Sequence, residues 1–324
     1  MISSYLSSPI VLGLVLVVGL VLLVKGADWL VDGASQLARR LGVTDLVIGL
    51  TIVAFGTSMP EFVVNMVSCA KGATDLAITN ILGSNSINTL VILGCAALIF
   101  PIMVQRNTIR FDIPMNILAG VLVLVFVFLT AALAPYKSIS RLEGMCLLVV
   151  FFAFLGYSFL SAKDNAPTNT SFTFPVWKCA VLILLGLVCL VIGGEMIVKS
   201  ATMIARQIGV SEAIIGLTIV ALGTSLPELA TSVIAAFKHN GDIAIGNVVG
   251  SNIFNVFFIL GVSAIIRPLP AYEGIVLDAS IATLSAVILW LLAMCNKQHT
   301  IQRWGGAILL IVYAAYLTYR LIGI

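Results

Sequence analysis

Long apolar stretches recur along the whole chain and are separated by short polar connections. A helix needs about 20 apolar residues to cross the hydrocarbon core of a bilayer, because backbone groups find no water there. The pattern predicts ten such spans, at residues 8–33, 43–70, 76–100, 113–134, 143–162, 176–203, 210–237, 243–266, 275–295 and 304–322. The expected fold class is therefore an all-α membrane protein with ten transmembrane helices.

Composition agrees with this pattern. Hydrophobic residues make up 60% of the 324 residues and charged residues 10%, whereas a soluble domain carries about 25% charged residues. The net charge of +3 is small and dispersed, so a nucleic-acid partner is not expected. The first apolar stretch is longer than a signal-peptide core and has no basic residue ahead of it, so we expect it to be retained as a helix.

Metal and catalytic residue types are sparse. The six cysteines lie in or at the ends of apolar stretches without metal-ligand spacing, and we interpret them as small core side chains. His239 and His299 lie in polar connections, so a zinc site or a Ser/His or Cys/His pair lacks a candidate within the membrane. We therefore expect neither an enzyme nor a bound cofactor.

Basic residues are distributed unevenly between the two sets of connections. One set is Arg39, Arg40, Arg106, Arg110, Lys163, Lys178, Lys238, Lys297 and Arg303. The other set is Lys71, Lys137, Arg141, Arg206, Arg267 and Arg320. The richer set should be cytoplasmic, which predicts that both termini lie outside the cytoplasm.

Two segments of the first half return in the second half at a constant offset of 167 residues. GLTIVAFGTSMPE from Gly49 returns as GLTIVALGTSLPE from Gly216, and GSNSINTLVILG from Gly83 returns as GSNIFNVFFILG from Gly250. The constant offset indicates a duplication, with halves at 1–162 and 175–324 joined by a polar linker at 163–174. Because each half holds five spans, an odd number, the second half must be inverted relative to the first. Inverted repeats are typical of secondary transporters that bind substrate near the bilayer midplane.

The repeated motifs bring oxygen-bearing side chains into the apolar spans. The second span contains Thr57, Ser58 and Glu61, the seventh contains Thr224, Ser225 and Glu228, and the third and eighth add Ser84, Asn88, Ser251 and Asn255. An ionisable group at that depth costs about 2.5–3.5 kcal/mol on insertion scales, so it indicates a functional site. Pro60 and Pro227 lack an N–H and should break their helices, which frees backbone carbonyls.

These donors are all oxygen, which favours a hard cation such as Ca²⁺ or Na⁺ over Zn²⁺ or Cu²⁺. Two ionised glutamates carry a charge of −2, which one Ca²⁺, two Na⁺ or two protons would neutralise. Competition for shared oxygens is a simple physical basis for antiport. For Asn85 and Asn252 a ligand role and a role in interhelical hydrogen bonding stay equally open. Asp28 and Glu195 correspond under the repeat, and we expect structural pairing, for instance with Lys25 or Lys199.

At GTSMPE and GTSLPE, each followed by a G-S-N-x-x-N segment, the sequence resembles the sodium/calcium exchanger family within the calcium/cation antiporters. The resemblance implies that two gating helices, the first and sixth, slide over a fixed core. It also implies a compact prokaryotic member in a bacterial inner membrane, since the chain lacks the large soluble insertion of the animal exchangers.

The same resemblance implies twelve cation ligands, of which the two alanines would act through their carbonyls. They are Ala54, Thr57, Ser58, Glu61, Ser84, Asn88, Ala221, Thr224, Ser225, Glu228, Ser251 and Asn255. Some microbial members carry Asp at the position of Asn255, whereas this chain has Asn at 88 and 255. Its pocket therefore holds two acids instead of three, which leaves Na⁺ or H⁺ open as the counter-ion.

The leading hypothesis is a secondary antiporter that exchanges Ca²⁺ for Na⁺ by alternating access. Its partners would be the transported cations and the lipid bilayer, with no obligatory protein partner. A cation/proton antiporter is the nearest alternative. A passive cation channel would use similar oxygens but has no need of opposed half-sites.

Overall fold

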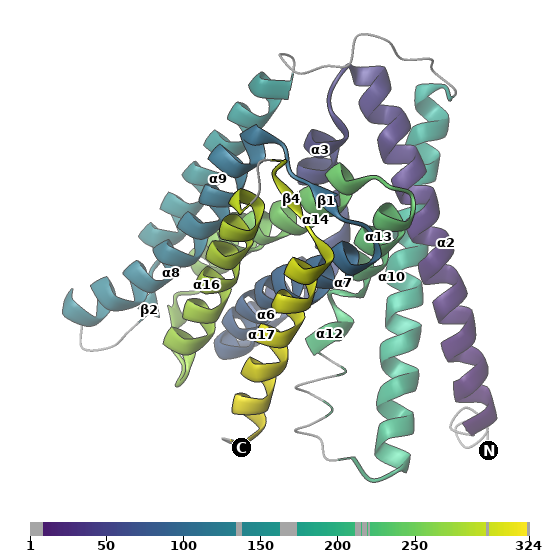
Figure 1. Ribbon diagram of the computed structural model, residues 1–324. Helices are drawn as coiled ribbons and strands as arrows, with labels where there is room; N and C mark the ends of the chain where they lie inside the picture. The colour runs from purple at the N-terminus through teal and green to yellow at the C-terminus, as the bar shows by residue number, and fades with distance from the viewer. Residues whose placement is uncertain are drawn as a thin grey trace.

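The computed structural model describes residues 9–133, 138–162, 174–210, 215, 219, 221–295 and 298–322. Most of these residues are helical (Figure 1), which confirms the all-α prediction. The start of the first helix and the end of the last helix lie at the same end of the molecule.

The first half contains long helices interrupted by short π-helical segments, which are labelled η. Its elements are α2 (Pro9–Leu41), α3 (Asp45–Ile48), η1 (Gly49–Val53), α4 (Ala54–Thr57), α5 (Met59–Lys71), α6 (Thr74–Ile87), η2 (Asn88–Ile92), α7 (Leu93–Ile99), β1 (Ile102–Met103), η3 (Thr108–Asp112), α8 (Ile113–Leu133), β2 (Ser138–Ile139) and α9 (Arg141–Ala162).

The second half repeats much of this order. Its elements are α10 (Val176–Gln207), α12 (Ala221–Gly223), α13 (Leu226–Phe237), α14 (Gly241–Ile253), η5 (Phe254–Leu260), α15 (Gly261–Ile266), β3 (Leu269–Pro270), α16 (Ile275–Met294), β4 (Thr300–Ile301) and α17 (Arg303–Ile322). The predicted linker at 163–174 lies outside the described residues except for its last residue.

The described helices make this a multi-pass membrane protein. Seven of them are long and apolar enough to cross a bilayer, and the bent pair Asp45–Thr57 and Met59–Lys71 would be an eighth. The predicted span at 210–237 falls partly outside the described residues and is represented by the shorter helix Leu226–Phe237. The predicted span at 304–322 corresponds to the 20-residue α17, which is not among the seven. The expected count of ten spans is therefore not confirmed.

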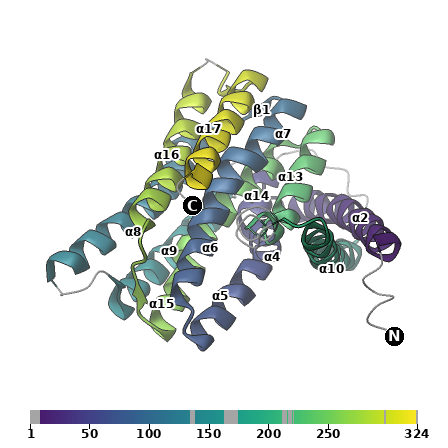
Figure 2. The ribbon, with the colours of Figure 1, turned by 90° about the horizontal axis from the view of Figure 1, so that it is seen from below.

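The two longest helices, α2 and α10, pack against each other at the edge of the molecule (Figure 2). Glycines allow their backbones to touch. A Cβ atom on Gly26 would lie 2.8 Å from the carbonyl oxygen of Gly186, and one on Gly19 would lie 3.0 Å from that of Gly193. As residue numbers rise along α2 they fall along α10, so the helices are antiparallel. Only 28% of the apolar window of each helix is buried, which leaves most of their surface available to lipid.

The core is built from the continuous helical rods Thr74–Ile99 and Gly241–Ile266, whose apolar windows are 78% buried. The second rod also crosses the helix that carries the first motif. A Cβ atom on Gly250 would lie 2.6 Å from the carbonyl oxygen of Leu50, so only glycine allows this approach. Within both rods a π-helical segment follows the G-S-N motif, and such segments occur frequently at functional sites.

Two short antiparallel strand pairs join the halves. β1 pairs with β4, with Ile102 opposite Ile301, and β2 pairs with β3, with Ile139 opposite Leu269. Each pair takes one strand from each half. One residue of each strand is fully buried, namely Ile102, Ile139, Leu269 and Ile301.

The cysteines are only partly core residues. Cys69 and Cys179 are buried, but Cys146 and Cys295 are exposed. The core interpretation is therefore wrong for these two, because an apolar stretch in a membrane helix also has a face that turns outward from the protein.

Candidate cation site

A break in a helix carries each of the two acidic motifs. The bend between α4 and α5 is 45°, and Ser58 at the break has φ −83° and ψ 9°. Pro60 lies in the first turn of α5, where its missing N–H removes no helical hydrogen bond. In the second half Ser225 has φ −89° and ψ 6°, and Pro227 opens α13 in the same way. Both predicted helix breaks are therefore present.

The two glutamates of these motifs are fully buried and reach across the halves. Ser58 Oγ donates to Glu228 Oε1 at 2.8 Å, and Ser225 Oγ donates to Glu61 Oε1 at 3.2 Å. Glu61 Oε1 also accepts from Ser84 Oγ at 3.5 Å. These three serines and both glutamates form one buried cluster made by both repeats.

Thr57, Ala54 and Ser251 meet beside this cluster. Thr57 Oγ1 lies 3.4 Å from the carbonyl oxygen of Ala54, which also accepts from Ser251 Oγ at 3.5 Å. Thr57 Oγ1 further donates to Asn247 Oδ1 at 3.0 Å, and Asn247 Nδ2 donates to the carbonyl of Glu228 at 3.2 Å. Asn247 is a residue that the motif analysis did not select, although its correspondence with Asn80 under the repeat was a signal.

Asn88 and Asn255 each form a hydrogen bond with the first asparagine of the G-S-N-x-x-N segment in the opposite repeat. Asn88 Nδ2 donates to Asn252 Oδ1 at 3.2 Å, and Asn255 Nδ2 donates to Asn85 Oδ1 at 3.0 Å. Asn85 Nδ2 donates to the carbonyl of Asn252 at 3.1 Å. Asn85 and Asn252 therefore hydrogen-bond between helices, as one of their two open interpretations expected.

The last two predicted ligands belong to the segment before α13. Ala221 begins α12, and Thr224 follows that helix. Thr224 is half-buried and lines a cavity of about 390 Å³ with Pro60, Glu195 and Pro227. This cavity lies between α5, α10 and α13, next to the buried cluster.

Several oxygens of the predicted ligands, in and beside the cluster, have no hydrogen-bond partner among the described residues. They are Glu61 Oε2, Glu228 Oε2, Asn88 Oδ1, Asn255 Oδ1 and Thr224 Oγ1. In the described part of the chain, no Lys or Arg side chain is buried, so none offsets the charge of the two carboxylates. Buried carboxylates are costly unless a positive charge accompanies them. Two carboxylate oxygens, two amide oxygens and one hydroxyl oxygen without partners are chemically suited to a cation.

The buried cluster is unlike a zinc site. Across the described ranges, no three His, Cys, Asp or Glu side chains gather where they could hold a metal ion. The oxygens here come mainly from hydroxyl, amide and carbonyl groups, which suit hard cations.

Comparison with known proteins gives the family. A family model described as sodium/calcium exchanger protein matches residues 11–160 and 178–322. The chain belongs to the sodium/calcium exchanger family. It is 40% identical over 316 residues to the putative antiporter CaxA of Alkalimonas amylolytica, covering 92% of this chain and 95% of that protein. It is 33% identical over 339 residues to the sodium/calcium exchanger MaX1 of Methanosarcina acetivorans, covering 94% and 97%.

The fold agrees with that of a solved exchanger. The structure of the sodium-calcium exchanger NCX_Mj soaked with 10 mM Na⁺ and zero Ca²⁺ matches with a TM-score of 0.83 and 31% identity, covering 96% of this chain and 99% of that one. The exchanger family is one of membrane antiporters, so this chain is a cation antiporter.

In this exchanger the acids of the two long helices are paired, as expected, but one partner differs. Glu195 Oε1 lies 2.6 Å from Lys199 Nζ. Asp28 pairs instead with Lys238, at 2.6 Å, and not with Lys25; Asp32 binds the same Lys238 Nζ at 2.7 Å. Lys238 caps the end of α13 and is far from α2 in sequence, so local spacing gave no sign of it.

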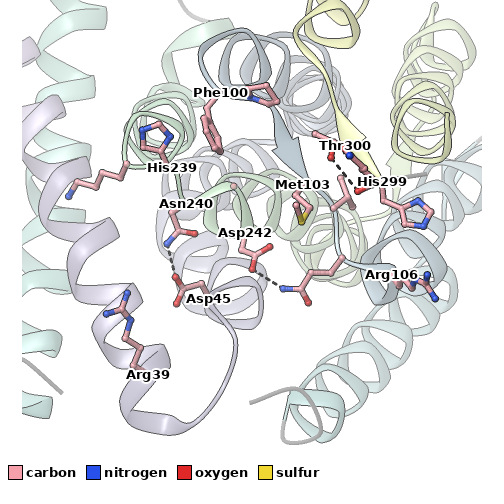
Figure 3. A pocket seen from close by; sticks show the side chains of 16 residues that line it. Arg39, Asp45, Phe100, Met103, Arg106, His239, Asn240, Asp242, His299 and Thr300 are labelled. Atoms are coloured by element: carbon pink, nitrogen blue, oxygen red, sulfur yellow. Dashed lines mark hydrogen bonds between the residues drawn. The ribbon is translucent and has the colours of Figure 1, made fainter. Parts of the chain in front are cut away.

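The exchanger also has a pocket of about 820 Å³ at the end where β1 meets β4 (Figure 3). Two carboxylates line it. Asn240 Nδ2 donates to Asp45 Oδ2 at 2.6 Å, and Gln105 Nε2 donates to Asp242 Oδ2 at 2.8 Å. Since side-chain amides already bind these two carboxylates, the pocket is chemically distinct from the buried cluster.

Proposed function

We propose that the chain exchanges Ca²⁺ for Na⁺ across a bacterial inner membrane by alternating access. The site would comprise the twelve predicted ligands, with Glu61 and Glu228 supplying the charge. The observation that carries this proposal is the pair of serine–glutamate hydrogen bonds across the halves, which gathers both motifs around two fully buried carboxylates.

We further propose ten spans in two inverted repeats, with both termini outside the cytoplasm. Several equivalent contacts support the inversion. The contact of Gly19 with Gly193 corresponds, at the offset of 167 residues, to the contact of Gly186 with Gly26. The strand pair β1·β4 has its counterpart in β3·β2, which again exchanges the halves. The start of α2 and the end of α17 lie at the same end of the molecule, which supports an even number of spans (Figure 1).

The charge balance supports exchange. One Ca²⁺ or two Na⁺ would equally neutralise the charge of the two carboxylates. Burial penalises any state in which the carboxylate charges have no compensating cation. Asn at both 88 and 255 limits the pocket to two acids. That composition leaves the counter-ion open, so the second candidate is a Ca²⁺/H⁺ antiporter in which two protons replace the Na⁺ ions.

Ca²⁺ uptake into vesicles tests the proposal. An imposed Na⁺ gradient should drive uptake, and a pH gradient of equal size should not. Uptake driven only by the pH gradient would establish the second candidate instead, and uptake that persists with no gradient of either ion would indicate a channel.

Two variants test the site assignment. Glu61→Gln and Glu228→Gln should each weaken Ca²⁺ binding at least about 100-fold, because losing one partner of a buried charge interaction costs about 3–5 kcal/mol. Glu273→Gln, at an exposed glutamate between β3 and α16, is the matched control and should retain uptake. Unaltered uptake in either site variant would contradict the assignment.

A further inference from the structure

Asparagine side chains have two edges of nearly the same shape, one an oxygen and the other an NH₂ group. Close packing therefore does not decide which edge faces a cation, and hydrogen bonds to fixed neighbours must decide it. At Asn88 and Asn255 this choice matters, because an NH₂ edge turned toward a cation would repel it.

The orientation at Asn255 is determined by a chain of two hydrogen bonds. The backbone carbonyl of Asn252 can only accept, so Asn85 must present its NH₂ edge to it, and the two atoms lie 3.1 Å apart. The oxygen edge of Asn85 then faces Asn255, which must donate its own NH₂ group at 3.0 Å. The oxygen of Asn255 is left on the opposite edge and has no hydrogen-bond partner among the described residues.

At Asn88 the hydrogen bonds run through the side chain of Asn252 and the hydroxyl of Thr89, with no backbone carbonyl involved. Asn252 Nδ2 donates to Thr89 Oγ1 at 2.8 Å, and Asn252 Oδ1 accepts from Asn88 Nδ2 at 3.2 Å. The position equivalent to Thr89 in the second repeat is Val256, which offers no hydroxyl. This difference explains why Asn85 uses a backbone carbonyl where Asn252 uses a side chain.

We infer that Asn85 and Asn252 are positioning residues that turn the amide oxygens of Asn255 and Asn88 toward the transported cation. The inference rests on the proposed cation site and deepens it. All four side chains are at most 5% exposed, so water does not compete for these hydrogen bonds. Each repeat thus orients a ligand that belongs to the other repeat.

Making Asn85→Leu in two backgrounds, the native chain and Asn255→Asp, distinguishes a positioning role of Asn85 from a general contribution to fold stability. Asn85→Leu should raise the Ca²⁺ dissociation constant of the purified protein about 10- to 100-fold, which is the usual effect of losing an outer-shell partner of a metal ligand. In an Asn255→Asp background the same change should raise it far less, because a carboxylate presents an oxygen on either edge. Isothermal titration with Ca²⁺ measures both.

Thr89→Val is a second variant with little risk to folding, since the equivalent position already holds valine. It should raise the dissociation constant about 2- to 10-fold, as expected for one lost hydrogen bond, and Asn88→Asp should suppress that effect. Asn80→Leu is the control, because Asn80 binds Asn65 and none of the predicted ligands. Its Ca²⁺ dissociation constant should match that of the native chain.

The outcomes distinguish the two proposals. An unchanged dissociation constant in Asn85→Leu, or an equal loss in both backgrounds, overturns the positioning role and leaves the proposed function standing. A native chain without affinity for Ca²⁺ overturns the proposed function and the positioning role with it.

Discussion

The polar core and the α2–α10 pair are held by different forces. In the core, buried amides and hydroxyls form hydrogen bonds across the halves, as Asn247 does with Thr57. In the pair, glycine backbones touch, and a partly exposed cluster at Lys238 links α2 to α13. A displacement of the pair would therefore break few buried hydrogen bonds, whereas deforming the core would break many. The division into two gating helices and a fixed core stays a prediction, and it requires a difference of this kind.

The largest effect should come from a core amide. Asn247→Leu removes hydrogen bonds to Thr57, Ser232 and the Glu228 carbonyl. Each buried polar group left without a partner costs about 1–3 kcal/mol, so we expect a loss of roughly 2–4 kcal/mol in the free energy of unfolding. Thermal unfolding in detergent measures it.

The repeat supplies the control for this core variant. Asn80 occupies the equivalent position in the first half but is only half-buried, and its Nδ2 donates to Asn65 Oδ1 at 2.9 Å. Asn80→Leu should cost about 1 kcal/mol. Equal losses in the two variants would show that burial does not set the strength of these contacts.

The next effect tests the glycine contact between α2 and α10. In Gly26→Ala the new Cβ would lie 2.9 Å from Cys189 Cβ as well as against the Gly186 carbonyl. Overpacking of this kind costs about 1–3 kcal/mol. Gly13→Ala on the same helix is the matched control, since a Cβ there has nothing within 4 Å. If both substitutions shift the unfolding temperature alike, close backbone contact is not what holds the pair.

A smaller effect should come from the cluster at Lys238. Its side chain is 28% exposed and that of Asp28 is 36% exposed, so solvent screens the attraction. A double-mutant cycle of Lys238→Gln with Asp28→Asn should give a coupling of about 0.5–1 kcal/mol that falls as salt is raised. A coupling that does not respond to salt would argue against an ionic link between α13 and α2.

The smallest effect should come from Glu195 and Lys199. This pair lies within α10, and its side chains are 62% and 68% exposed. It does not connect α10 to the core. The corresponding cycle, Glu195→Gln with Lys199→Gln, should therefore give a weaker coupling than the Lys238 cycle. The opposite ranking would mean that the link to α2 contributes nothing beyond a surface pair.

Much of the helical fold follows from the sequence because apolar length alone specifies a membrane helix. The repeat and the two prolines also predicted where the motif helices break, and Ser58 and Ser225 lie at those breaks. The site could be anticipated because Glu61 and Glu228 are ionisable residues in apolar surroundings, a local property.

The remaining features depend on contacts between distant residues. The hydrogen bond of Thr57 with Asn247 joins residues 190 positions apart, and the ion pair of Asp28 with Lys238 joins residues 210 positions apart. No local pattern encodes either contact. The strands β1 to β4 are two residues long, too short for a periodic pattern. The π-helical segment at Asn88–Ile92 lies in the buried core and has no local sequence pattern that predicts it.

The hydrogen bonds between the halves bear on how the chain is made. Glu61 leaves the ribosome 164 residues before Ser225, its partner. At about 5–20 residues per second, roughly 8–33 s of synthesis separate them. During that interval the third, fourth and fifth predicted spans are synthesised, while Glu61, Asn85 and β1 have no partners from the second half. The membrane insertion machinery must therefore shelter an incomplete protein, and a message truncated near its middle should yield a product for quality-control proteolysis instead of a stable half-transporter.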